Sequence, residues 1–154
     1  MRATFSSPGK TKRLTIYSDG RSFWDGKYEA LSGMAKAEPA LVASHDHPGM
    51  ISVAEGMGRV DRNSDGDANN DGYNERLGAY EVIANGPRVE LTISARRATL
   101  VRPLLEVSSL PQGKVLVTLE GRLVESWTRL KDGNVLIEIP ARIEQPATVN
   151  IRVE

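Results

Sequence analysis

Residues 87–95 read Pro-Arg-Val-Glu-Leu-Thr-Ile-Ser-Ala, and this stretch decides the fold class. Val89, Leu91 and Ile93 fall on one side of an extended chain, and the residues between them are polar. A period of two places one face of a strand against a core and the other face in water. Residues 147–153 repeat the pattern, because Val149, Ile151 and Val153 alternate with polar neighbours. Both stretches therefore predict half-buried antiparallel strands.

Further short apolar runs follow along the chain, separated by Gly, Pro, Asn and Asp turns at roughly ten-residue spacing. The expected strands are 12–18, 40–45, 50–54, 79–84, 87–95, 98–107, 114–119, 122–128, 134–139 and 147–153. One short helix is expected over 27–36, where Gly33 weakens it. The sequence therefore predicts an all-β fold, an antiparallel, jelly-roll-like β-sandwich with at most one short helix.

The composition is typical of a globular domain. The chain has 154 residues, with 20 basic and 20 acidic side chains and no cysteine. We expect one β-sandwich domain over 1–154, a module of a larger chain. Balanced charge without a basic stripe predicts no nucleic-acid partner, and the lack of an apolar run of about 20 residues predicts no membrane partner.

A six-residue unit is written twice without a spacer, as DRNSDG at 61–66 and DANNDG at 67–72. Oxygen-bearing side chains recur at every second position and each unit ends on glycine. Calcium takes six to eight oxygen ligands and accepts carboxylate, amide and backbone oxygens together. Zinc and copper prefer sulfur and imidazole, whereas this chain has no cysteine and two histidines. The repeat therefore predicts a calcium-binding loop, and the alternative is a solvated Asn/Asp turn.

The D-x-N-x-D-G unit resembles the first half of the EF-hand loop and the calcium loops of dockerins and thrombospondin type 3 repeats. It departs from the EF-hand at position 12, where an acid is needed and Gly72 stands. Asp71, Glu75 or the more distant Glu81 is expected to complete the coordination instead, helped by the backbone carbonyl of Tyr73. We expect one or two calcium ions, held by Asp61, Asn63, Asp65, Asp67, Asn69, Asp71, Tyr73 and Glu75.

A second resemblance covers residues 71–82, DGYNERLGAYEV, which are similar to a segment of β-rich modules in large bacterial secreted proteins, many of them polysaccharide-degrading. The strands from 116 to 153 resemble the terminal sandwich domains of such proteins. The resemblance implies a non-catalytic accessory or carbohydrate-binding module, whose partners are a polysaccharide and neighbouring domains of the parent protein.

Aromatic side chains are few, and Trp24 and Tyr28 are the candidate ligand-binding pair. Trp24 precedes Asp25-Gly26, a loop-like context in which an aromatic face can stack on a sugar ring. The alternative is that Trp24 and Trp127 anchor the core.

No nucleophile elbow, phosphate loop or free carboxylate pair is evident, so a catalytic role is the weaker interpretation. It would be a small calcium-dependent glycoside hydrolase or polysaccharide lyase in which His45 or Tyr28 transfers a proton. A third alternative is an adhesion or assembly domain. His45 and His47 could also share a transition metal, but the following Pro48-Gly49 favours an exposed turn.

The expected location is extracellular or at the cell surface, where millimolar calcium suits weak module-type sites. Residues 1–5, MRATF, lack the apolar core of a signal peptide. The chain is therefore expected to be either cytoplasmic or a piece of a longer secreted protein, and the calcium loop favours the second.

Overall fold

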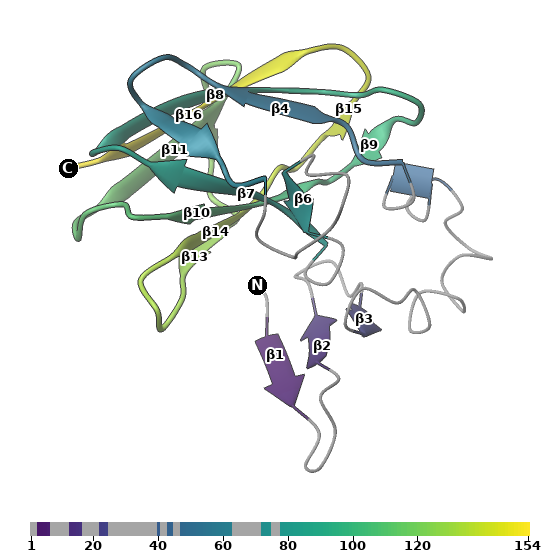
Figure 1. Ribbon diagram of the computed structural model, residues 1–154, viewed down its shortest axis with the longest axis horizontal. Helices are drawn as coiled ribbons and strands as arrows, with labels where there is room; N and C mark the ends of the chain where they lie inside the picture. Colours follow the sequence, from purple (N-terminus) through teal and green to yellow (C-terminus); the bar gives the residue numbers. More distant parts are fainter. Residues whose placement is uncertain are drawn as a thin grey trace.

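The computed structural model describes residues 3–6, 13–16, 22–24, 40, 43–44, 47–62, 72–74 and 78–154, and most of them lie in strands. Two large sheets lie face to face (Figure 1). Sheet I has the strand order β12 (Arg122–Val124), β11 (Val115–Leu119), β16 (Ala147–Val153), β8 (Arg88–Ser94), β4 (Met50–Val53).

Sheet II is the second layer and has six strands. Its order is β13 (Trp127–Arg129), β14 (Val135–Glu138), β10 (Leu104–Ser108), β7 (Ala79–Ala84), β5 (Gly58–Val60), with β6 (Tyr73–Asn74) also paired to β7. Two small sheets complete the described strands: β1 (Ala3–Ser6), β2 (Arg13–Ile16) and β3 (Ser22–Trp24) form one, and β9 (Leu100–Val101) and β15 (Arg142–Ile143) form the other. The predicted all-β sandwich is confirmed.

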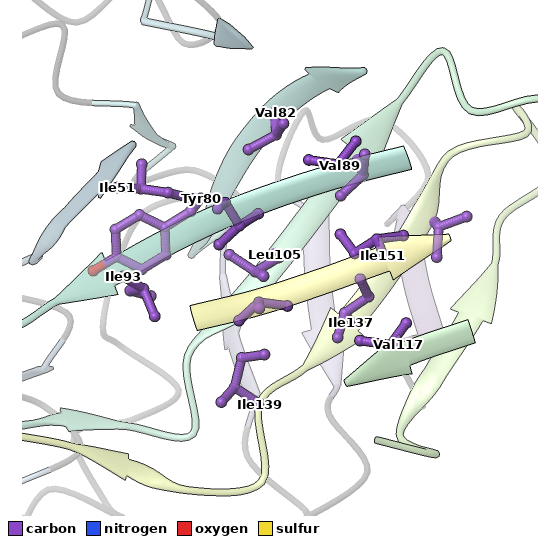
Figure 2. Close-up of a cluster of buried hydrophobic side chains, with 14 of the residues drawn as sticks. Ile51, Tyr80, Val82, Val89, Ile93, Leu105, Val117, Ile137, Ile139 and Ile151 are labelled. Carbon is purple, nitrogen blue, oxygen red and sulfur yellow. The ribbon is translucent and has the colours of Figure 1, made fainter. Parts of the chain in front are cut away.

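The core lies between the two large sheets, where alternate residues of each strand meet (Figure 2). Val89 and Ile93 of β8 face inward, as the alternation in the sequence predicts, and each is at most 1% exposed. Tyr80 of β7 and Leu105 of β10 reach the same interior from sheet II. Packing of two inner faces in this way removes apolar surface from water at about 25 cal/mol per Å².

Both sides of the sandwich are crossed by the chain itself. On one side β4, an edge strand of sheet I, runs through the turn at Ala54–Met57 into β5 at the edge of sheet II. On the other side β12 of sheet I continues through Glu125 and Ser126 into β13 of sheet II. An open sheet edge is a template for unwanted pairing. Each edge strand here leads directly into the edge of the opposite sheet.

Sheet I is antiparallel throughout, whereas sheet II contains one parallel pair, β7 with β10, in which Leu105 lies opposite Tyr80. The predicted sandwich was antiparallel only. The chain leaves β7, runs through β8 in the opposite sheet and then returns to sheet II as β10. Two reversals of direction restore the original one, so β10 pairs with β7 in parallel.

Three predicted strands differ from the observed elements. The strand expected over 40–45 is wrong at its described positions, because Ala40, Ala43 and Ser44 are helical. Alanine is the strongest helix former, and it occupies two of these three positions. The run 98–107 divides into β9 and β10 around Pro103, which has no N–H to donate. The run 122–128 divides into β12 and β13, one in each sheet.

The helix predicted over 27–36 lies outside the described residues. Across the part of the chain that the structure describes, no helix has the length and apolar character to cross a membrane.

Truncating a side chain between the sheets should destabilise the protein strongly. Leu105 is 0% exposed, so Leu105→Ala is expected to lower the free energy of unfolding by about 2–5 kcal/mol. Leu123→Ala is the matched control, since Leu123 is 60% exposed and its removal should change stability by less than about 0.5 kcal/mol. Urea denaturation measures both, and equal losses would contradict the assigned core.

Candidate functional site

The acidic repeat is inserted at a single position of sheet II. β5 and β6 both pair antiparallel with the same edge of β7, since the other edge is occupied by β10. Val60 lies opposite Val82 and Tyr73 lies opposite Tyr80, which leaves Glu81 between them. β5 and β6 are therefore two pieces of one interrupted strand.

Glu81 bonds to both ends of the interruption. The N–H of Asp61 donates to the carbonyl oxygen of Glu81 at 2.9 Å, and the N–H of Glu81 donates to the carbonyl oxygen of Gly72 at 3.0 Å. In an uninterrupted antiparallel ladder, one residue would exchange both bonds with Glu81. Here Asp61 supplies its N–H and Gly72 supplies its C=O. The chain thus leaves and rejoins the sheet at one rung, at the first and last residues of the repeat.

This placement suits a chelating loop. When the sheet already holds the two ends of a loop together, part of the entropy cost of closing the loop is met on folding. Less conformational entropy is then lost when the loop binds an ion. Compact loops with adjacent ends are a common carrier of function. The limits of the oxygen-donor repeat in the sequence and the limits of the insertion in sheet II coincide, because both lie at Asp61 and Gly72.

The outgoing end of the repeat is anchored in the core. Gly72 has a φ of 86°, and an added Cβ would overlap the Cγ1 atom of Val60. Tyr73 is 4% exposed, and its ring packs on that of Tyr80 with centroids 4.8 Å apart at 60°. The hydroxyl oxygen of Tyr80 in turn accepts a hydrogen bond of 2.7 Å from the N–H of Gly49. The position of the loop's exit is therefore fixed by packing.

Acidic side chains form a row beside the insertion point. The β5–β7 register extends to place Asp61 opposite Glu81, and Glu106 of β10 is the Cα partner of Glu81. Neighbouring strands are about 4.8 Å apart, so these carboxylates repel one another. Asn134 donates to Oε1 of Glu106 at 3.1 Å, and all three acids have further interactions. A nearby cation would reduce the remaining repulsion.

The described residues do not by themselves assemble three His, Cys, Asp or Glu side chains around a metal position. Of the predicted ligands, Asp61 and Tyr73 are described, and Tyr73 is buried in β6. The others lie outside the described residues: Asn63, Asp65, Asp67, Asn69, Asp71 and Glu75. The calcium site stays a prediction from the sequence. The structure adds that both ends of the repeat are held together by hydrogen bonds to Glu81.

Of the predicted ligand-binding pair, Trp24 lies within the described residues and Tyr28 lies outside them. Trp24 ends β3, where it lies opposite Leu14 of β2, so its backbone belongs to a strand and not to the loop-like context expected. Tyr28 and His45 lie outside the described residues. His47 is exposed, and its N–H bonds to the carbonyl of Ala43 at 2.9 Å, as in a turn. Trp127 is half-buried against the core, as its alternative role predicts.

The outer face of sheet I carries a groove that the sequence did not indicate. Its volume is about 480 Å³, and it crosses β8, β16, β11 and β12. The main polar and apolar side chains that line it are Arg88, Glu90, Leu116, Thr118, Asn150 and Arg152. In the sequence each of these six residues is next to an apolar residue that points into the core, so each belongs to the outward face of its own strand. Only the register of the sheet brings them together.

Two rows of side chains make up this groove. Thr118 lies opposite Asn150, which lies opposite Glu90. In the second row Leu116 lies opposite Arg152, which lies opposite Arg88. Leu123 of β12, opposite Thr118, extends the first row as an exposed apolar side chain. Hydrogen-bonding groups thus occupy the middle of the groove, and leucines occupy its β11–β12 end.

The chain matches no protein-family model and no curated protein.

Substitution of Gly72 should lower the stability of the fold more than substitution of Gly56, a glycine with a similar φ whose added Cβ would contact nothing. Gly56 has a φ of 79° with nothing near an added Cβ, so Gly56→Ala tests backbone strain alone. Gly72→Ala adds the overlap with Val60 and is expected to destabilise by about 1–3 kcal/mol more. Thermal and urea unfolding of both variants provide the comparison, and equal stabilities would contradict the described packing at the loop exit.

Proposed function

We propose that this chain is a non-catalytic, calcium-stabilised β-sandwich module that binds carbohydrate, an accessory part of a secreted polysaccharide-acting protein. The observation that carries the proposal is the double hydrogen bonding of Glu81, which closes the acidic repeat at its first and last residues. Alternating oxygen donors in a loop whose two ends are held together are better explained by a bound hard cation than by a solvated turn.

Calcium bound in this loop would act on stability. An ion that binds the folded state alone adds RT ln(1 + [L]/Kd) to the free energy of unfolding, about 2.7 kcal/mol at a hundredfold excess over Kd. The repeat ends on Gly72, next to Tyr73 and Tyr80 in the core. An ion bound by the repeat would therefore also hold β5 and β6 on the edge of β7.

The groove on sheet I supports the carbohydrate-binding part of the proposal. Its volume of about 480 Å³ lies in the range of small-molecule sites. Asn150 and Thr118 offer donors and acceptors for sugar hydroxyls, and Glu90 offers acceptors. Trp24 and Tyr28 stay a separate prediction for a stacking platform. An extracellular or cell-surface location would supply the calcium concentration that weak loops need.

Calcium should raise the melting temperature through the repeat. Adding millimolar calcium to chelator-treated protein is expected to raise it by about 5–10 °C, from the linkage energy above and the usual response of a domain of this size. Asp65→Asn removes one carboxylate charge and should abolish most of the increase. Glu144→Gln is the matched control, because Glu144 is exposed and far from the repeat in the chain, and it should leave the increase intact. Differential scanning fluorimetry at verified metal content measures the effect, and a calcium-independent melt would refute the calcium part of the proposal.

Carbohydrate binding should occur without turnover. Native electrophoresis through gels containing neutral or acidic polysaccharides is expected to retard the protein in at least one of them, with no new reducing ends released. Leu123→Ala exposes less apolar surface at one end of the groove and should weaken retardation without changing stability. Unretarded migration in every gel would contradict carbohydrate binding, whereas release of reducing ends would favour the hydrolase or lyase alternative.

A further inference from the structure

Two arginines lie side by side in the groove of sheet I. Arg88 of β8 and Arg152 of β16 are Cα partners, and both side chains line the groove. Directly opposed residues have Cβ atoms about 4.5–5.5 Å apart, and like charges on such residues destabilise a sheet. Such a pair is a cost to the free protein unless an anion lies between the two guanidinium groups.

The two arginines are available to a ligand. Arg152 pairs with Glu154 at 2.8 Å, but both side chains are about half exposed, at 51% and 50%. An exposed ion pair of this kind contributes little, so a ligand anion can replace Glu154 at low cost. Arg88 is exposed and makes no side-chain hydrogen bond or ion pair with any residue in the described part of the chain. Its planar set of donors is free to take a carboxylate in a bidentate way.

The neighbouring row limits what kind of anion fits. Glu90 follows Arg88 by two residues on the same face of β8 and also lines the groove. Its carboxylate would repel a polymer with a charge on every unit and close spacing, such as a nucleic acid. Asn150 and Thr118 beside it are neutral and suit hydroxyl groups. The groove therefore matches carboxylates that are separated by neutral hydroxylated units.

The location on a sheet face favours a glycan over a peptide. The backbone groups of β8, β16 and β11 are engaged in pairing with their neighbours on both sides. An extended peptide that adds to a sheet needs a free edge, and its own backbone groups would stay unsatisfied on this face. From β12 to β8 the groove crosses three strand spacings, about 14 Å, which gives room for an oligosaccharide.

We infer that this groove binds a uronate-containing polysaccharide, with Arg88 and Arg152 holding a sugar carboxylate while Asn150, Thr118 and Glu90 contact neighbouring hydroxyls. The inference rests on the proposed carbohydrate-binding function and names its ligand class. Leu116 and Leu123, at the β11–β12 end, would cover the C–H face of the next sugar ring.

Short hyaluronan oligosaccharides, in which a neutral N-acetylated sugar separates successive uronates, and their fully methyl-esterified counterparts test this inference by isothermal titration calorimetry. The acid form should bind and the ester should not, because esterification removes the charge but keeps the hydroxyls. Arg88→Ala should weaken binding about ten- to hundredfold, as expected for a lost charged hydrogen bond. Arg88→Lys should give an intermediate loss, because it keeps the charge without the fork. Arg142→Ala, an exposed arginine on β15 with the same change in net charge, is the matched control and should bind as the unmodified protein does.

The possible failures are distinguishable. Equal weakening by Arg88→Ala and Arg142→Ala, or equally tight binding of dextran sulfate or an acidic peptide, would overturn the uronate site. Binding of neutral glycans that is insensitive to Arg88→Ala would overturn it too, while leaving the proposed carbohydrate-binding function in place. Absence of binding to any polysaccharide would remove both. Urea denaturation of Arg88→Ala should show stability equal to or slightly above that of the unmodified protein, since a like-charge contact is lost.

Discussion

The pairing of β7 on both edges is the constraint on which the rest of sheet II depends. β10 occupies one edge in parallel, and the interrupted strand of β5 and β6 occupies the other. Tyr80 and Val82 bury their side chains between the sheets, at 1% exposure each. Glu81, between them, directs its backbone groups to the two ends of the acidic repeat. A shift of β7 by one residue would therefore turn Tyr80 and Val82 out of the core and put a different residue in the place of Glu81 between Asp61 and Gly72.

The edges of the sandwich explain where partners can bind. β4 continues into β5 on one side and β12 continues into β13 on the other, so each sheet edge leads into the opposite sheet. This arrangement discourages pairing with an added strand, and it leaves the sheet faces and the inserted loop as the places for recognition. The groove and the loop lie at the two ends of β5. Met57, before β5, lines the groove, and Asp61, after β5, begins the repeat.

The elements that could be predicted are those whose pattern is local. The strand limits expected over 79–84 and 147–153 agree with β7 and β16, because alternating apolar residues there are bounded by clear turns. β5 and β6 were missed, since three and two residues are too few to show a period. The run 122–128 contains no Gly or Pro, so the change of sheet between Val124 and Trp127 left no signal. In the candidate site, the repeat could be identified by its spacing, whereas no local pattern joins Arg88 to Arg152.

The sequence by itself determined the all-β class, the inward faces of the long strands and the oxygen-rich repeat, because each depends on the spacing of residues within one segment. Only the tertiary structure decided that both ends of the repeat form hydrogen bonds with Glu81, that β7 and β10 run parallel, and that two arginines from β8 and β16 share one groove. These features arise from hydrogen bonds between strands far apart in the chain. Their register is set by how the two buried faces fit together, which no single segment encodes.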